Sequence, residues 1–398
     1  SASPRPSITY RPSPIERAFA SPFARGVEAG GIAAKSFNPN FEGDFLGVYY
    51  TRQAVTGVDR VSRVVGFNQQ IVGTHQRQTG TTPRVIGTTQ TVVQGPAGTA
   101  PQVVTTPVVV QDPVFVLDPI IATTPITVDD LVQRKQIVRL PAAARYNGVM
   151  ITENENPRPV DRVYVGYNFY SDVGASLNPG LGGSDVQRQT AGFEMTFLDG
   201  DASIGMRLPY VQQYGPAGLG SQNVGDVSVI LKYAFYNDLE TGDLGSGGVM
   251  ITAPTGSGNS LTLADGTALP HSTLFQPWVG FVRMFDAGYF QGIANVIIPT
   301  DSRDPALFGK SLAAGYFLYR DPTAPVLTAI TPKIELHLRT PLSHRDPNGL
   351  VYMQDQLNVT AGVNLGIGRA TLSTAVSTPL LGPRPYGVEA ISYLNFNF

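Results

Sequence analysis

The stretch Lys333-Ile334-Glu335-Leu336-His337-Leu338-Arg339-Thr340-Pro341 decides the fold of this chain. Apolar and charged side chains alternate along it without a break, which is the period of an extended strand with one apolar and one polar face. The run ends in a proline, where a missing backbone N–H is tolerated because strand pairing stops. The stretch therefore predicts a β-strand that separates an apolar environment from a polar one.

Four further runs end in the same way. They are Arg207-Leu208-Pro209, Thr252-Ala253-Pro254, Ile297-Ile298-Pro299 and Ser377-Thr378-Pro379. With Pro341, the five prolines lie 45, 45, 42 and 38 residues apart along the chain. This spacing fits two strands and their two connections, so the recurring unit is predicted to be a β-hairpin.

Sustained alternation begins at Val163 and predicts twelve strands up to the C-terminus. Their ranges are 163–171, 187–198, 201–212, 224–237, 246–255, 273–285, 288–299, 308–320, 327–341, 354–366, 369–379 and 386–398. Every second connection is short, as at 198–201, 286–288 and 366–369, whereas the others are mostly long and rich in Gly and Pro, as at 172–186 and 255–272. Short turns at one end and long loops at the other are typical of outer-membrane barrels.

We therefore expect an all-β fold, a transmembrane antiparallel up-and-down β-barrel of about twelve strands over residues 151–398. Residues 1–150 form a long, partly irregular N-terminal extension rich in Pro, Thr, Val and Gln, which serves as a plug, an arm or an assembly segment. Within it, residues 1–36 favour an extended or disordered arm, and 41–52 and 59–72 favour short strands.

Three segments of the extension have their own interpretation. Residues 78–111 hold a single charged residue, Arg84, and indicate a flexible linker or short strands that add to a neighbour. Carboxylates at the start and cations at the end of 129–135 predict a short helix. Residues 150–159 predict a polar connector to the first barrel strand.

The overall composition excludes several classes of protein. The net charge of −2 offers no basic footprint for nucleic acid. Cysteine is absent, so neither disulfides nor thiolate metal sites can form. The sequence has no run of about 18 apolar residues, so it predicts no transmembrane helix. The start at Ser1, without Met, favours a mature terminus from which a signal peptide has been removed.

The strand endings Ala253-Pro254-Thr255-Gly256 and Ile298-Pro299-Thr300-Asp301, with the C-terminal residues 393–398, resemble bacterial outer-membrane barrels. More narrowly, they resemble the transporter-like barrels grouped with the MetA pathway of phenol degradation, and residues 152–159 resemble a connector of planctomycete proteins. The resemblance covers residues 150–398. It implies a barrel-assembly signal at Tyr393, Phe396 and Phe398 that the barrel assembly machinery recognises.

Eight polar residues occupy the predicted inward register and are candidates to line the lumen: Glu194, Arg207, Lys232, Lys333, Glu335, His337, Arg339 and Glu389. They either pair with one another to fill a narrow barrel or form a constriction that selects permeants. Seven aromatic residues are expected to face the membrane: Tyr233, Phe235, Trp278, Phe290, Tyr316, Tyr393 and Phe396.

The sequence favours neither catalysis nor a metal or cofactor site. None of the four histidines has a second histidine at helical ligand spacing. Gly309-Lys310-Ser311 ends like a phosphate-binding loop, but the first glycine of that motif is replaced by Asp304. The enzymatic rival is an outer-membrane phospholipase, which would need a nucleophile and a base on one accessible face. We expect no enzyme, no cofactor and no metal.

Two functions remain. The first is a passive channel or transporter for small solutes in the bacterial outer membrane. The alternative is a structural envelope protein, with the barrel as anchor and residues 1–150 making homo-oligomeric or envelope contacts. A soluble β-sandwich is the third interpretation. The expected partners are outer-membrane lipid, the barrel assembly machinery and a copy or envelope partner that binds residues 1–150.

Overall fold

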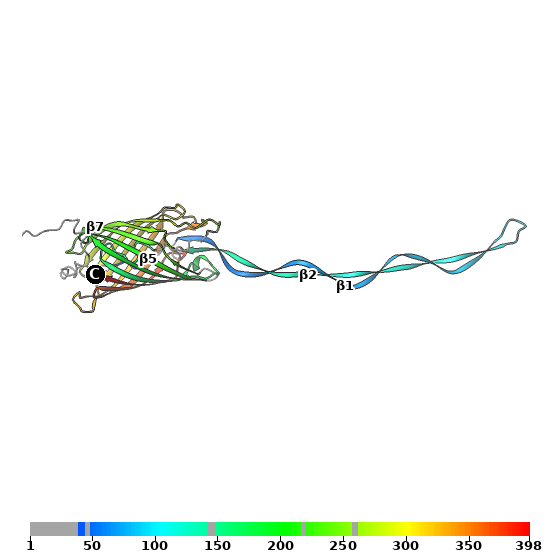
Figure 1. The fold of residues 1–398 in the computed structure, drawn as a ribbon, viewed down its shortest axis with the longest axis horizontal. Coiled ribbons are helices and arrows are strands. Elements are labelled where there is room, and N and C mark those ends of the chain that lie inside the picture. Colours follow the sequence, from blue (N-terminus) through cyan, green and yellow to red (C-terminus); the bar gives the residue numbers. More distant parts are fainter. Residues whose placement is uncertain (1–38, 44–47, 142–148, 216–219, 257–261) are drawn as a thin grey trace, which may run out of the picture. The chain divides into compact units, whose positions relative to one another are not determined.

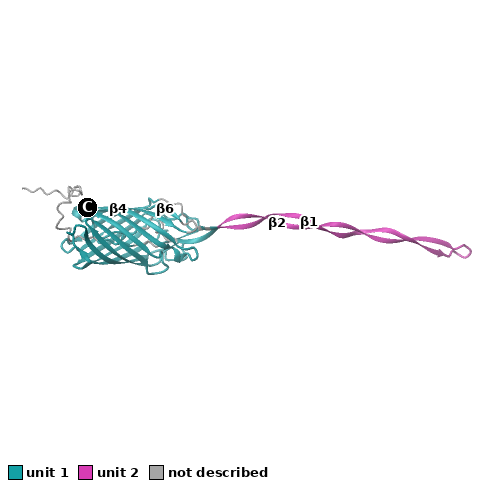
Figure 2. Ribbon diagram, turned by 90° about the horizontal axis from the view of Figure 1, so that it is seen from below, with its two compact units in different colours: residues 1–57, 134–398 teal, residues 58–133 magenta. Residues whose placement is uncertain are grey.

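The computed structural model describes residues 39–43, 48–141, 149–215, 220–256 and 262–398 of the chain. The arm expected over residues 1–36 lies outside the described residues. Contacts divide the chain into two compact units: unit 1 comprises residues 1–57 and 134–398, and unit 2 comprises residues 58–133 (Figure 2). The expected domain boundary between residues 150 and 151 therefore falls within unit 1.

Unit 1 is built around a closed barrel of twelve antiparallel strands (Figure 1). The strands are β3 (Arg162–Val173), β4 (Ser184–Phe197), β5 (Ala202–Tyr214), β7 (Val227–Asn237), β8 (Leu244–Ala253), β9 (Leu274–Phe285), β10 (Gly288–Pro299), β11 (Leu307–Tyr316), β13 (Leu327–Pro341), β15 (Gln356–Ile367), β16 (Ala370–Pro379) and β17 (Glu389–Asn397). Each pairs with its neighbours along the chain, and β3 pairs with β17 to close the ring. The fold class predicted from the alternation is confirmed.

Strand alternation gives the barrel an apolar outer face and a polar interior. In β13, Ile334 and Leu336 are exposed on the outside, whereas Lys333, Glu335 and His337 are buried. Because closure pairs every interior strand edge, an apolar outer face can meet lipid without leaving backbone groups unpaired. No helix among the described residues is long and apolar enough to cross a membrane.

Two aromatic residues expected to face the membrane point inward instead. Trp278 and Tyr393 are buried, because both fall on the inward register of β9 and β17. Trp278 packs with Phe41 and Ile151, which precede β3 in the chain. The alternation of these strands thus outweighs the general preference of aromatic side chains for a membrane girdle. The other five aromatic residues are exposed.

Three buried tyrosines lie over glycines on the neighbouring strand. Tyr393 is paired with Gly166, Tyr164 with Gly192 and Tyr289 with Gly315. A Cβ atom added to Gly166 would overlap the ring of Tyr393, far inside van der Waals contact. The glycines therefore make room for rings that fill the barrel interior, and the first pair lies on the seam that closes the barrel.

We expect Gly166→Ala to destabilise the barrel by about 1–3 kcal/mol, because the methyl group overpacks the seam between β3 and β17. Urea unfolding of the protein refolded into lipid vesicles measures the change. Gly87→Ala is the control, since an added Cβ there meets no atom within 4 Å. Because the overlap is with the Tyr393 ring, Gly166→Ala should cost less in a Tyr393→Ala background than in the unmodified protein, and an equal cost in both backgrounds would contradict this explanation.

Four of the five strand-ending prolines behave as predicted. Pro299, Pro341 and Pro379 are the last residues of β10, β13 and β16, and Pro254 follows β8 directly. The prediction is wrong for Pro209, because β5 continues to Tyr214. A short strand, β6 (Ser221–Val224), takes over as the partner of β5 just before β7 begins at Val227, and this exchange occurs next to Pro209.

The N-terminal extension forms two long paired strands, β1 (Tyr49–Val93) and β2 (Gln102–Pro141). Residues 49–57 and 134–141 belong to unit 1, and the remainder is unit 2, which we call the ribbon (residues 58–133). Of the two alternatives for residues 78–111, the flexible linker is wrong and the strands are found, as parts of β1 and β2, whereas the helix predicted at 129–135 is wrong. Asp129 and Asp130 instead bind Ser62 Oγ at 2.6 Å and Arg63 Nε at 2.9 Å across the two strands.

A ladder of three exposed ion pairs runs along the ribbon: Arg84–Asp112 at 2.7 Å, Arg77–Asp118 at 2.5 Å and Arg63–Asp130 at 2.9 Å. Successive arginines are seven or fourteen residues apart, whereas their aspartate partners are six or twelve apart. β1 therefore carries one extra residue per repeat, which is a β-bulge. Bulges increase right-handed twist, and Figure 1 shows β1 and β2 winding around each other.

Candidate functional site: the barrel interior and its plug

Two segments that precede β3 in the chain lie in the interior of the barrel. Residues 39–43 and 149–159 are all buried, and we call them together the plug. Plug atoms bind inward side chains of at least seven strands. Glu155 binds Arg162 of β3, Arg207 of β5 and Lys232 of β7, and Glu153 binds Arg188 of β4. The Pro157 carbonyl oxygen accepts a hydrogen bond from Ser246 of β8, that of Asn40 accepts one from Lys333 of β13, and Asn154 binds Asn395 of β17. The interior is thus occupied by the chain itself.

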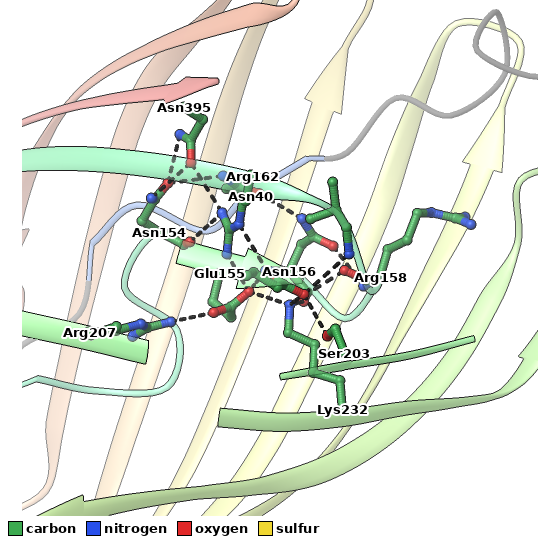
Figure 3. A network of polar contacts seen from close by, with 12 residues as sticks. Asn40, Asn154, Glu155, Asn156, Arg158, Arg162, Ser203, Arg207, Lys232 and Asn395 are labelled. Atoms are coloured by element: carbon green, nitrogen blue, oxygen red, sulfur yellow. Dashed lines mark hydrogen bonds and ion pairs between the residues drawn. The ribbon is translucent and has the colours of Figure 1, made fainter. Parts of the chain in front are cut away.

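Glu155 is the centre of the largest ionic cluster (Figure 3). Its carboxylate forms ion pairs with Arg162 at 2.6 Å, with Arg207 at 2.5 Å and with Lys232. Glu194 shares two of these cations, at 3.0 Å from Arg162 and 2.7 Å from Lys232. All five side chains are almost completely buried. Removing any one of them would leave an opposite charge inside the barrel without its full set of partners.

The surrounding cations hold Glu155 in its charged form. Burial raises the pKa of its carboxyl, but the charges of Arg162, Lys232 and Arg207 outweigh burial and lower that pKa to about 2. Glu155 is therefore ionised at neutral pH and binds the plug to the barrel wall electrostatically.

A second ionic cluster joins the other plug segment to β13. Lys333 binds Glu42 at 2.7 Å and Glu335 at 3.0 Å, and its Nζ also donates to the carbonyl oxygen of Asn40 at 2.7 Å. The Glu335 carboxylate accepts hydrogen bonds from the backbone N–H groups of Glu42 and Gly43. The segment 39–43 is therefore bound to the wall by both its side chains and its backbone.

Buried amide groups link the two plug segments to each other (Figure 3). Asn40 donates to Asn154 at 2.9 Å and accepts from Asn156 at 2.6 Å. Asn154 in turn donates to Asn395 of β17 at 3.0 Å. Amides can donate and accept at once, so the chain of contacts satisfies polar groups that burial would otherwise penalise.

The structure places all eight candidate lumen residues in the buried interior. Most bind the plug as well as one another: Arg207 and Lys232 bind Glu155, Lys333 and Glu335 bind residues 40–43, and Arg339 donates to Thr152. Glu389 accepts from Asn168 at 2.8 Å. A role for these residues in selecting permeants stays a prediction.

Sequence reasoning missed the partners of these residues. Arg162 and Arg188 lie on inward positions of β3 and β4, so strand parity could have identified them. Glu42, Glu153 and Glu155 lie in segments without strand alternation, and no periodic signal marks them. Glu153 is bound to Arg188, whose guanidinium also donates to the hydroxyl oxygen of Tyr170 at 2.6 Å.

One buried trio has the residue types of a hydrolase triad. Nδ1 of His337 lies 2.9 Å from Ser311 Oγ, and Nε2 lies 3.0 Å from Glu335. However, all three residues are buried and Phe41 of the plug packs its ring against His337. A nucleophile needs an accessible face, so this trio fits a structural hydrogen-bond chain better than catalysis. Among the described residues, no cluster of acidic or histidine side chains could hold a metal ion.

The loops at the long-loop end of the barrel hold the base of both extension strands. Tyr49 and Tyr50 of β1 pair with β14 (Val351–Tyr352), and the hydroxyl of Tyr50 donates to Asp304 at 2.8 Å. On the other strand, the backbone N–H of Arg139 donates to Asn178 at 2.9 Å. The part of β1 and β2 that belongs to unit 1 is thus hydrogen-bonded to the barrel loops.

No protein-family profile matches the sequence, and a search of curated proteins found no match. Solved structures with a similar chain path include an outer membrane channel, COG4313, from Pseudomonas putida F1. It is 15% identical, with 60% of this chain and 96% of that chain covered and a TM-score of 0.44. The KdgM porin is 8% identical, with coverage of 60% and 99% and a TM-score of 0.37. The NanC porin is 12% identical, with the same coverage and TM-score.

Proposed function

We propose that this protein is a structural protein of the bacterial outer membrane, in which a plugged barrel anchors the ribbon. The observation that carries the proposal is the plug, which is bound to the wall of the barrel by buried ion pairs centred on Glu155. A barrel whose interior is filled by its own chain serves as an anchor without needing a permeant.

The outer face of the barrel supports a membrane location. Large apolar side chains are exposed on it, including Val165, Val279 and Leu336. Closed antiparallel barrels with an apolar outer band are typical of the outer membrane. The ribbon is covalently continuous with the parts of β1 and β2 that belong to unit 1, and Tyr50 and Arg139 bind these parts to the barrel loops.

A closed interior predicts an electrically silent barrel. Displacing the plug would leave Arg162, Arg207 and Lys232 with one acidic partner fewer in a buried site, which is costly. Purified full-length protein inserted into a planar lipid bilayer should therefore give no conductance steps at neutral pH. Steady ohmic steps from the unmodified protein would contradict the anchor function.

Acidification should remove the contribution of Glu155 to the plug only at low pH. The folded-state pKa of Glu155, about 2, lies below its ordinary value of 4.5. A group with a lowered pKa stabilises the folded state above its unfolded pKa, and this contribution declines as the pH falls from about 4.5 towards about 2. We therefore expect the difference in unfolding free energy between the unmodified protein and Glu155→Gln to stay constant above about pH 5 and to shrink only within that acidic window. A difference that already shrinks above about pH 5 would contradict the role of Glu155.

A passive channel for small solutes is the second candidate function. The observation that favours it is the set of charged side chains on the inner wall, which would line an aqueous path if the plug left the barrel. The same bilayer experiment separates the two functions, since a channel conducts at neutral pH and an anchor does not.

A further inference from the structure

The two faces of the ribbon differ in charge. β2 alternates its side chains, so its even-numbered and odd-numbered residues lie on opposite faces. The even positions carry Asp112, Asp118 and Asp130, which pair with arginines of β1, and we call this side the ion-pair face. The odd positions from Val103 to Thr127 hold no charged residue, and we call this side the uncharged face.

Both faces of β2 carry exposed apolar side chains, and those of the uncharged face are the more exposed. Phe115 and Leu117 are 52% and 60% exposed, whereas Val114 and Val116 on the ion-pair face are 40% and 45% exposed. Within unit 2 itself, only two strands are present, and a two-stranded ribbon buries too little to be stable on its own. A second layer that covers Phe115 and Leu117 would supply the missing burial.

The uncharged face also repeats regularly. Five prolines lie six residues apart, one directly before β2 and four within it, at positions 101, 107, 113, 119 and 125. Apolar side chains follow them at the same spacing, as with Val109, Phe115 and Ile121. An occupant must therefore match a six-residue repeat and the twist of the ribbon over several repeats. A second copy of this chain carries that repeat and twist by construction.

The area of the uncharged face is sufficient for a stable contact. Residues 103–127 extend over about 80 Å at about 3.3 Å per residue, and two strands are about 10 Å wide. Each copy thus presents about 800 Å², which is the area that one partner contributes to a standard interface.

The prolines favour packing through the face over addition at the strand edge. Their even spacing directs all the missing N–H groups to one edge of β2. In a paired strand proline is confined to the edge that has no partner, so a strand added at that edge would lose every third donor. Prolines of this kind are one way in which natural sheets block edge pairing. The contact between copies would therefore stack ribbons through side chains.

We propose that the ribbon self-associates, with the uncharged face of one copy packed against that of another and the ion-pair face left in water. This rests on the proposed function, in which the barrel anchors the ribbon. It names a second copy of this chain as the partner that the ribbon binds.

Single cysteines test the proposal, since the natural chain has none. Val109→Cys places a thiol on the uncharged face, and Val110→Cys, at the next residue, places one on the ion-pair face. After mild oxidation of the full-length protein in outer membranes, we expect at least about tenfold more disulfide-linked dimer from Val109→Cys. Leu117→Cys and Val116→Cys form a second matched pair. Equal yields from both faces, or no dimer from either pair, would overturn the proposal.

A charge introduced on the uncharged face provides an independent measurement. Phe115→Asp should reduce the detergent-corrected mass of the purified protein to that of one chain, whereas Val116→Asp, on the ion-pair face, should retain the larger mass. A single-chain mass for the unmodified protein would refute self-association while leaving the anchor function intact. Conversely, conductance at neutral pH together with face-specific cross-links would refute the closed plug and leave self-association standing.

Discussion

Glu155→Gln should open the barrel and destabilise it by about 3–5 kcal/mol, the cost of removing one partner from a buried ion pair. The new amide could still accept a hydrogen bond, but the negative charge that Arg162, Arg207 and Lys232 share would be gone. These cations would then repel one another, and water entering the interior would solvate them better than the plug does. We expect conductance steps at neutral pH and, because the wall keeps an excess of cations there, a preference for anions.

The control is Asp355→Asn, which removes one carboxylate from the exposed ion pair Arg345–Asp355. Exposed pairs contribute less than about 1 kcal/mol, so this variant should stay silent and unfold like the unmodified protein. Urea unfolding in vesicles gives the stability, and bilayer recordings give the conductance. A Glu155→Gln variant as stable and as silent as the control would show that the ion pairs do not retain the plug.

Val279→Arg should destabilise the inserted barrel by about 2–4 kcal/mol. Val279 lies on the outward register of β9 and is 59% exposed, so an arginine there must be transferred into hydrocarbon if the strand crosses the membrane. Unfolding of the variant in lipid vesicles measures the cost.

Leu318→Arg serves as the matched control for this variant. Leu318 is 65% exposed but lies in the turn between β11 and β12 (Tyr319–Arg320), beyond the barrel strands. An arginine at the membrane interface costs about 0–1 kcal/mol. Equal effects at the two positions would indicate that the apolar face of β9 does not meet lipid.

The barrel was predictable because its signal is local and periodic. Each inward charge of β13 follows an outward apolar residue, so Ile334 and Glu335 define both the strand and its facing. The plug carries no such signal. Glu155 gains its partners from β3, β5 and β7, and a contact between residues far apart in the sequence leaves no pattern in a single chain.

The ribbon was not predicted from the sequence for a different reason. The charges of 129–135 suit a helix over one or two turns, but Asp129 and Asp130 pair instead with residues of the opposite strand. A weak local preference for helix is outweighed by the pairing of β2 with β1. Two sequence signals could have identified the ribbon: the prolines of β2 at intervals of six, and Gly66, Gly73, Gly80 and Gly87 of β1 at intervals of seven.

The repeat is seven residues long in β1 and six residues long in β2. The length of the ribbon can therefore change only by whole repeats. An insertion or deletion in one strand alone would move every arginine beyond it away from its aspartate. Only the paired change, seven residues in β1 with six in β2, restores the register, and it alters the reach of the ribbon by about 20 Å. The ribbon is in this sense a modular ruler, whose span can be lengthened or shortened by whole repeats.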